Sequence, residues 1–490
     1  MQRMVKQFII SFFFLFPILA QAQVNDPIKI RFSFIGDIMQ HGPQIRGAYN
    51  PIDDNYNYFP SLQYIAPSIR QADIAIANLE LTLAGKPYSG YPTFSAPDEL
   101  AVALKQSGVD ILVTANNHSL DRRQQGLERT IRVLDSLKIP HTGTFINQDE
   151  RNFSYPYIIE KKGARIALLN YTYGTNGIPV TEPNIVNLID TTQIKLDLKN
   201  AAKVNPDLTI LFVHWGWEYK RLPNEEQKML TEFCRKNGVD MVIGSHPHVL
   251  QPNEWDEDFL VVYSLGNFVS NQRDRYKDGG MIFSVEVEID PVSRDHKIAE
   301  AGYQLTWVYK KPSGSHSEYF ILPAAQHSSR ELLSDKSDLD QMELFLTDSR
   351  QLFQNENKGL IKEYKYPVFH LPFYNHKAEF VYRKSKEDHL TTKLILNNQS
   401  KTKTGTNHSF AQNSNPKTTF RIQLIVSENN LKSSSFSRKY FPTIYKEKVN
   451  GMTRYLSGDY SSMQEAEDQL LIILNETKFK DAYIVEREIN

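Results

Sequence analysis

The sequence predicts an α/β protein with a large layered domain followed by a small α+β domain. Between Ile28 and Val269, short apolar runs alternate with helical patterns, which is typical of a sheet covered by helices. Several runs are too continuously apolar for a sheet with one face in water. Around residue 400 apolar residues almost disappear, and periodic structure resumes only at Phe420, which separates the two domains.

Composition and charge describe a folded, multidomain chain. Its 490 residues exceed one typical domain, and 40% hydrophobic residues supply enough apolar surface for a sizeable core. The formal net charge is -1, and no long block of one sign occurs. This balance gives no electrostatic support for nucleic-acid binding, so we expect no nucleic-acid partner.

Residues 1–22 have the pattern of a secretory signal peptide. The apolar run Phe8–Ala20 ends at Ala20-Gln21-Ala22, a small-x-small cleavage site. The run is shorter than the roughly 20 residues that span a bilayer, which favours cleavage over a retained membrane anchor. The single cysteine, Cys234, excludes an intrachain disulfide. We therefore expect an exported protein of the periplasm or cell surface, without a stable transmembrane anchor.

The first domain is expected to span residues 27–310. Its strand-like runs are Ile30–Ile35, Ile74–Ala77, Ile111–Val113, Ile166–Leu169, Leu208–Val213, Met241–Ile243 and Leu260–Tyr263. Helical patterns between them are Asp98–Gln106, Leu127–Leu137 and Glu225–Lys236. Residues 311–396 are expected to extend this domain. A strand is expected at Ile282–Val287, before this extension. Within the extension, a strand is expected at Tyr319–Leu322 and a helix at Leu339–Asn355.

Residues 397–419 have the polar composition of a flexible linker, rich in Asn, Gln, Ser, Thr and Lys. The tail, residues 420–490, then predicts a small α+β domain. Its expected elements are strands at Phe420–Val426, Thr453–Gly458 and Ala482–Val485 and a helix at Met463–Asn475.

Metal-binding residue types follow five of the strand-like runs. They are Asp37, Glu80, Asn117 with His118, His214, and His246 with His248. Loops at the carboxyl ends of strands in α/β sheets converge on one crevice, so these groups can meet. A mixed carboxylate, amide and imidazole set suits Mn, Fe or Zn. The pattern predicts a shared site for divalent metal ions, with room for two, and His41 is included because it follows Asp37 by four residues.

Each of these residues also has a purely structural explanation. Asp37 resembles a helix cap, and Glu80 a solvated carboxylate. Asn116-Asn117-His118 resembles a turn, and His246-Pro247-His248 a surface loop. The repeated position at strand ends favours the shared site over these separate roles.

Six motifs occur in a fixed order along the first domain. They are Gly36-Asp37-Ile38-Met39, Ala77-Asn78-Leu79-Glu80, Asn116-Asn117-His118 with Asp121 and Gly126, His214-Trp215-Gly216 with Glu218-Tyr219, Gly244-Ser245-His246-Pro247-His248, and Tyr263-Ser264-Leu265-Gly266-Asn267-Phe268. In this order they resemble the motifs of the CapA family of poly-gamma-glutamate capsule proteins, which is related to the calcineurin-like metallophosphoesterases. The resemblance implies an αββα sandwich with a two-metal site.

The resemblance also implies residue roles. The metal ligands are Asp37, Glu80, Asn117, His214, His246 and His248, and His118 is the imidazole that protonates a leaving group. Phosphoesterases carry a His two residues after the first Asp, but this chain has Met39 there. His41 is expected to supply the lost imidazole; otherwise one metal site lacks a ligand.

Hydrolysis is the chemistry that such a site permits. His118 would act as general acid, and the spacing makes Asp121 the residue that orients it. Trp215, Tyr219 and Arg221, with Trp217 nearby, are expected to line a substrate groove. A packed loop with an Arg that reaches out to solvent is the open alternative for these residues.

The tail carries a second resemblance. Its motifs are Arg421-Ile422-Gln423-Leu424, Thr453-Arg454-Tyr455-Leu456-Ser457-Gly458-Asp459-Tyr460-Ser461, Glu465-Ala466 and Lys480-Asp481-Ala482-Tyr483-Ile484-Val485. They are similar to the SPOR domain of bacterial envelope proteins, which implies a ferredoxin-like fold that binds peptidoglycan glycan strands. The resemblance places the first helix near Ser434–Lys448. It assigns glycan contacts to Gln423, Arg454, Tyr455 and Gly458; an accessory domain without a ligand is the alternative.

The first hypothesis is an exported CapA-type metal-dependent hydrolase, or an envelope polymer-processing protein, tethered to peptidoglycan by its tail. Its substrate would be a poly-gamma-glutamate-like polymer or a phosphoester. The second hypothesis is a non-catalytic scaffold that binds such an anionic polymer in the same groove. A third is a peptidoglycan-binding protein in which the tail is the working part.

Overall fold

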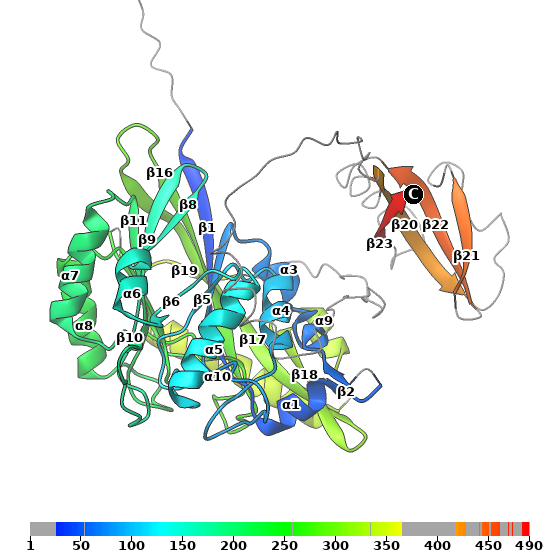
Figure 1. Cartoon of the computed structure of the whole chain (residues 1–490), viewed down its shortest axis with the longest axis horizontal. Helices are drawn as coiled ribbons and strands as arrows, with labels where there is room; N and C mark the ends of the chain where they lie inside the picture. Colours follow the sequence, from blue (N-terminus) through cyan, green and yellow to red (C-terminus); the bar gives the residue numbers. More distant parts are fainter. Residues whose placement is uncertain are drawn as a thin grey trace, which may run out of the picture. The chain divides into compact units, whose positions relative to one another are not determined.

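The computed structural model describes two parts of the chain (Figure 1). The described residues are 26–52, 54–256, 258–333, 335–364, 417–427, 441, 443–449, 452–460, 469, 473 and 483–489. The chain divides into two compact units, Met1–Val368 and Phe369–Asn490. The expected signal peptide and most of the expected linker lie outside the described residues.

The larger unit contains a nine-stranded sheet, called the first sheet. Its spatial order is β18 (His316–Pro323), β17 (His296–Ser313), β16 (Gly279–Ile289), β1 (Ile28–Ile38), β4 (Ile74–Leu79), β5 (Ile111–Val113) and β6 (His141–Thr142), with β15 (Asn267–Val269) beside β1 and β19 (Ile361–Glu363) beside β17. Strands β1, β4, β5 and β6 run parallel, whereas β16, β17 and β18 add to β1 in antiparallel order.

A six-stranded second sheet completes the strand layers. Its order is β13 (Asn253–Trp255), β14 (Leu260–Val262), β12 (Met241–Ser245), β11 (Leu208–His214), β9 (Ala164–Thr172) and β8 (Tyr157–Lys161). The four central strands are parallel. Two short ribbons lie outside the sheets: β2 (Tyr49–Asn50) with β3 (Asn55–Tyr56), and β7 (Thr144–Phe145) with β10 (Ile185–Val186).

The two sheets pack face to face, and alternation along each strand explains why. On β1, Phe32 and Phe34 join a central core that also contains Ile166 and Leu168 of β9 and Phe212 of β11. The residues between them on these strands point to the opposite faces, which helices cover. Both faces of each sheet are therefore buried, which confirms the expectation from the continuously apolar runs.

Helices form the two outer layers (Figure 1). Those that pack on the outer face of the first sheet are α2 (Phe59–Leu62), α3 (Ala66–Ile69), α4 (Glu99–Gln106) and α5 (Arg123–Ser136), and those on the second sheet are α7 (Thr191–Ala202) and α8 (Glu225–Lys236). The remaining helices are α1 (Gly42–Ala48), α6 (Gln148–Ser154), α9 (His327–Glu331) and α10 (Lys336–Glu356). The larger unit is thus a mixed α/β fold in four layers.

The sequence locates α8 to the residue, because its start and end signals are local. The Asn224 side chain accepts a hydrogen bond from the Gln227 backbone N–H, and the Gln227 side chain accepts one from the Asn224 N–H. By contrast, the apolar patterns did not predict α6, α7 or the long strand β17. Residues 316–363 continue the first sheet through β18 and β19, and α10 packs on the central core through Met342 and Phe345.

The smaller unit contains a four-stranded antiparallel sheet. Its order is β21 (Ile444–Val449), β22 (Met452–Tyr460), β20 (Lys417–Ser427) and β23 (Tyr483–Ile489). Two expectations need correction. Residues 444–449 form a strand paired with β22, not part of a helix, and 417–419 belong to β20, not to the linker. The helix expected at Met463–Asn475 lies almost entirely outside the described residues.

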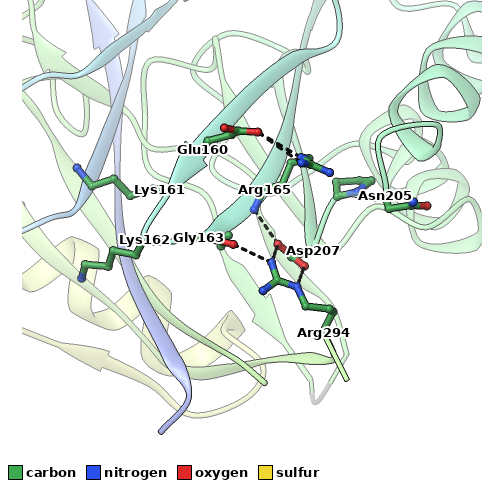
Figure 2. A pocket seen from close by; sticks show the side chains of 10 residues that line it. Glu160, Lys161, Lys162, Gly163, Arg165, Asn205, Asp207 and Arg294 are labelled. Carbon is green, nitrogen blue, oxygen red and sulfur yellow. Dashed lines mark hydrogen bonds and ion pairs between the residues drawn. The ribbon is translucent and has the colours of Figure 1, made fainter. Parts of the chain in front are cut away.

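A charged cavity of about 660 Å³ lies at the turn between β8 and β9 (Figure 2). There the Arg294 guanidinium, from the turn between β16 and β17, donates to the Asp207 carboxylate at the start of β11. The same carboxylate accepts from the Arg165 backbone N–H. This ion pair fastens the first sheet to the second, while Lys161 and Lys162 point away from it (Figure 2).

No helix in the described part of the chain combines the length and apolar composition needed to cross a membrane.

Gly36 allows the end of β1 to pass against the loop before β15. A Cβ atom there would lie 2.2 Å from the Gly266 carbonyl oxygen and 2.9 Å from the Leu265 Cβ. Gly36→Ala is expected to lower the free energy of unfolding by about 1–3 kcal/mol, because the backbone must move apart. Thermal or denaturant unfolding measures this loss.

Gly174→Ala is the matched control, because a Cβ atom at Gly174 meets nothing within 4 Å. Equal stability of the two variants would contradict the close approach at Gly36.

Candidate metal centre

The predicted ligands converge at one end of the sandwich, where the parallel strands finish. Six side chains gather there and all are buried: Asp37, Glu80, Asn117, His214, His246 and His248. Ligand atoms of Glu80, His246 and His248 all lie within 4.8 Å of one another, and so do those of Asp37, Glu80 and His214. Glu80 is common to both groups, so it could contribute to either.

The Glu80 carboxylate provides the strongest test of whether the site suits a metal. Both its oxygens are fully buried and have no hydrogen-bond partner among the described residues. The Nε2 atoms of His214 and His248 lie 3.5 and 3.7 Å from Oε1. Burial, and then the neighbouring Asp37 carboxylate, raise the pKa of Glu80 well above its usual value. A buried carboxyl group in this state requires a proton or a cation, and the donor set fits a divalent metal.

The histidines of the site favour the neutral form that binds metals. Burial lowers the pKa of His214 to about 3 and the pKa of His246 well below its usual value. A neutral imidazole keeps a lone pair for coordination. The Nδ1 atom of His246 is buried and has no hydrogen-bond partner among the described residues. Like the Glu80 oxygens, it is therefore a buried atom that could coordinate a metal.

The loop after β12 holds its two histidines in an unusual backbone conformation. His246 has φ of 100° and His248 has φ of 57°. Such values are uncommon for residues other than glycine and cost of order 1–3 kcal/mol each. The His246 backbone N–H also donates to Asp37 Oδ2 at 3.3 Å. The surrounding packing therefore holds both imidazoles toward the carboxylates.

Three polar residues that the sequence analysis did not select support the ligands. Asn78 donates to Asp37 Oδ1 at 2.9 Å. Ser245 Oγ lies 2.9 Å from His214 Nδ1, and Asn267 Oδ1 lies 3.1 Å from His248 Nδ1. All three belong to the quoted motifs, and Asn78 precedes Glu80 by two residues. Membership of those motifs was the signal that could have identified them.

Asn117 and His118 occupy different parts of the site. Asn117 Oδ1 lies 2.8 Å from His214 Nε2, so the amide oxygen faces the ligand cluster. His118 Nδ1 instead lies 2.7 Å from Asp121 Oδ2, which also accepts from the Phe94 backbone N–H. This contact fixes the orientation of the imidazole ring through Nδ1. The other ring nitrogen, Nε2, is then the one suited to transfer a proton. The catalytic roles of His118 and Asp121 stay predictions.

His41 lies at the start of α1, and neither ligand group contains it. Its Nδ1 lies 3.2 Å from Gln44 Oε1 and accepts from the Asn271 backbone N–H at 3.3 Å. Burial lowers its pKa to about 4. Met39 points into the hydrophobic core beneath the helices. The ligand role of His41 stays a prediction, and its Nδ1 is engaged elsewhere.

The residues predicted to line a substrate groove do not share one surface in the structure. Trp215 is buried in the core on the helix-covered face of the second sheet, and its Nε1 donates to the Tyr263 carbonyl at 2.9 Å. This corrects the expectation for Trp215, because a side chain enclosed by the core cannot reach a substrate. Arg221 donates to the Asp348 carbonyl and stacks over Tyr276, as in the packed-loop alternative. Tyr219 remains partly exposed beside His248.

The residues predicted to contact glycan lie on β20 and β22. Tyr455 is fully buried, and Gly458 has φ of 72°. The side chains of Gln423 and Arg454 lie outside the described part of the structure. Their ligand roles stay predictions.

A buried carboxylate and imidazole cluster at the strand ends of a four-layered α/β fold defines a candidate metal-binding domain. Residues 31–272 match the family described as "Bacterial capsule synthesis protein PGA_cap". This match supports the resemblance of this region of the chain to the CapA family.

Two curated relatives agree with the assignment. The chain is 28% identical over 267 residues to "Capsule biosynthesis protein CapA" of Bacillus anthracis, which covers 52% of this chain and 63% of that protein. It is 28% identical over 253 residues to "PGA biosynthesis protein CapA" of Bacillus subtilis, with coverage of 49% and 63%. The chain thus matches less than two thirds of the length of each relative.

Solved structures with partial similarity include two hydrolases. Sulfate thiohydrolase SoxB of Thermus thermophilus covers 61% of this chain and 47% of its own, at 15% identity and a TM-score of 0.32. A 5'-nucleotidase from Candida albicans covers 66% and 58%, at 14% identity and a TM-score of 0.34.

Metal binding is expected to stabilise the protein through Glu80. At a free metal concentration a hundred times the Kd, binding adds about 2.7 kcal/mol to the free energy of unfolding. Glu80→Gln is expected to abolish this increment while it leaves the metal-free protein about as stable as before, because it removes an ionisable group that has no partner. Unfolding of metal-free and metal-loaded protein, with mass-spectrometric metal content, measures both effects.

Asp197→Asn is the matched control. Asp197 is a buried carboxylate whose oxygens accept from Arg151 and Tyr171. Its loss is expected to destabilise the metal-free protein by about 3 kcal/mol, but the increment from metal should persist. A Glu80→Gln protein that keeps the full metal increment would contradict the assignment.

Proposed function

We propose that the protein is an exported metal-dependent hydrolase of the metallophosphoesterase type that acts on a cell-envelope polymer. The observation that carries the proposal is the Glu80 carboxylate, buried without a hydrogen-bond partner among the described residues and flanked by His214 and His248. Asp37, Asn117 and His246 complete a donor set with the composition of a site for Mn, Fe or Zn.

The proposed reaction divides the work between metal and protein. Two divalent cations would supply Lewis-acid activation of water and charge stabilisation at a phosphoryl or acyl centre. Asp37, Glu80, Asn117, His214, His246 and His248 would hold them. The six side chains are buried, so electrostatic interactions among them are stronger than in water.

His118 would donate the proton to the leaving group. Asp121 accepts its Nδ1–H, which leaves Nε2 to carry the transferred proton. The Phe94 ring lies 4.6 Å from the imidazole in an edge-on arrangement. Carboxylate and ring together restrict the imidazole to one orientation, so Asp121 acts as a positioning residue.

One observation favours a second candidate, a non-catalytic scaffold that binds an anionic polymer such as poly-gamma-glutamate. Phosphoesterases carry a His two residues after the first Asp. In this chain that position is Met39, which is buried in the core. His41 does not lie in either ligand group. A metal bound beside Asp37 would then have fewer protein ligands, and the protein would bind its polymer without turning it over.

For the smaller unit we propose peptidoglycan binding. Support comes from the strand order β21-β22-β20-β23, with all pairs antiparallel and the first and third strands in the centre. This is the order of the ferredoxin-like, duplicated βαβ domain that the SPOR resemblance implies. The signal-like residues 1–22 support export, so the protein would work in the periplasm or at the cell surface, held near its substrate by the tail.

His118→Ala is expected to lower kcat by about 10²–10⁴-fold, because the leaving group loses its proton donor. Metal content should stay unchanged, because His118 lies outside both ligand groups. Release of nitrophenol from p-nitrophenyl phosphate and bis(p-nitrophenyl) phosphate by the metal-loaded protein measures kcat. His327→Ala, at a largely exposed side chain on α9, is the control.

Saturable binding of poly-gamma-glutamate by a metal-loaded wild-type protein without any turnover would overturn the hydrolase proposal in favour of the scaffold.

A chain that ends at residue 396 is expected to keep the metal-dependent activity of the full chain and to lose binding to peptidoglycan. The larger unit contains every proposed ligand, and the proposed glycan contacts lie beyond the cut. Co-sedimentation with sacculi, with and without amidase treatment to remove stem peptides, measures binding. Equal sedimentation of the full and shortened chains would show that the tail does not bind peptidoglycan.

A further inference from the structure

We propose that three tyrosines, Tyr91, Tyr173 and Tyr219, form a rim around the metal centre that binds a sugar ring, so that the hydrolysed group is carried by a saccharide. We call these residues the tyrosine rim. The inference rests on the proposed function and specifies its substrate class. The tyrosines come from three separate loops, which follow β4, β9 and β11.

Tyr173 makes the closest approach to the ligands. Its ring centroid lies 4.5 Å from the His246 ring and 6.3 Å from the His214 ring, nearly parallel to the latter. Its backbone N–H donates to the His214 carbonyl at 3.0 Å. Even so, 47% of the side chain is exposed. One part of the ring therefore contacts the buried ligands while another part remains open to a bound molecule.

Tyr219 lies beside a different proposed ligand, His248. Its ring centroid is 6.1 Å from the His248 ring, and the residue is 43% exposed. The Tyr219 backbone N–H donates to the Pro247 carbonyl at 2.7 Å, between the two ligand histidines. The Lys277 ammonium lies 3.9 Å from the ring centroid. These contacts hold the ring in place, so little entropy is lost when it binds a ligand.

Tyr91 reaches the centre through Phe94. Its ring lies 6.4 Å from the Phe94 ring, which in turn contacts His118 at 4.6 Å and His41 at 5.3 Å. Tyr91 is 72% exposed, although Phe94 is fully buried. The aromatic surface thus continues from the proposed proton donor outward to Tyr91.

Exposed aromatic rings beside a polar centre suit a ligand that is apolar on its faces and polar at its edge. A sugar ring has this character, because its C–H faces pack on aromatic rings while its hydroxyl groups form hydrogen bonds. Tyrosine matches both parts, since it combines an apolar ring with a hydroxyl group. An extended, flexible chain would use such fixed rings less well.

Charge around the tyrosine rim argues against a densely anionic polymer. Glu218 is exposed between the ligand His214 and Tyr219 in the sequence. Lys277, the cation on Tyr219, is already paired with Asp274 at 2.7 Å. A polyglutamate chain would meet repulsion here, whereas a saccharide with one anionic group would meet less.

Binding to metal-loaded full-length protein tests the inference. The ring-bearing probe is N-acetylglucosamine 6-phosphate, the ringless probe of like charge is glycerol 3-phosphate, and the polyanion is a tetramer of gamma-linked glutamate. Titration calorimetry gives Kd, and phosphate release gives KM and kcat. Tyr91→Ala and Tyr219→Ala are each expected to raise Kd for the sugar phosphate about three- to tenfold, with a much smaller change for glycerol 3-phosphate.

Phe153→Ala is the control variant, because Phe153 is an exposed aromatic residue on α6. Equal effects of the tyrosine variants on both phosphates, or tighter binding of the glutamate tetramer than of the sugar phosphate, would overturn the tyrosine rim. If the tyrosine variants lose their preference for the sugar phosphate in Kd, and the wild type shows no measurable turnover, the tyrosine rim is supported and the hydrolase is contradicted. Equal kcat and KM for the sugar phosphate and glycerol 3-phosphate would support the hydrolase and contradict the tyrosine rim.

Discussion

The buried carboxylate of Glu80 is the constraint on which the rest of the site depends. An unpaired carboxylate inside a protein costs several kcal/mol in its charged form, so the fold must provide either a proton or a cation. No described residue donates a hydrogen bond to it. Elsewhere in the same unit, the buried Asp197 shows the ordinary solution, with an arginine and a tyrosine as donors. The difference between these two carboxylates separates a binding site from a structural ion pair.

Two packed sheets create the conditions for this constraint. Strands β1, β4 and β5 of one sheet and β11 and β12 of the other end at the same edge, so their final side chains face one another across the sandwich. Because helices cover the outer faces, these side chains are buried. At the other end of β11, the ion pair of Arg294 with Asp207 joins the sheets. One end of the sandwich carries a paired carboxylate, whereas the other carries the Glu80 carboxylate, which has no hydrogen-bond partner among the described residues.

The surroundings of the ligands suggest how the site selects what it binds. Asn78, Ser245 and Asn267 fix the carboxylate and imidazole groups, which leaves the outer boundary to residues of the loops. Aromatic side chains dominate that boundary, and Met39 occupies the core instead of the ligand shell. Selectivity would then arise from ring packing at the opening, and reactivity from the number of ligands inside.

Local patterns determined much of this protein. Strand periodicity indicated the layered fold class, and the capping pair Asn224 and Gln227 located α8. Residue type at strand ends selected six predicted ligands, which the structure brings close together. The tertiary structure decided what these patterns do not encode. Trp215 and Tyr219 lie four residues apart in one motif, yet one packs in the core and the other remains exposed beside His248. Tyr91 and Tyr173 had no local signal, because their proximity to the ligands arises only when loops distant in sequence meet at the edge of the packed sheets.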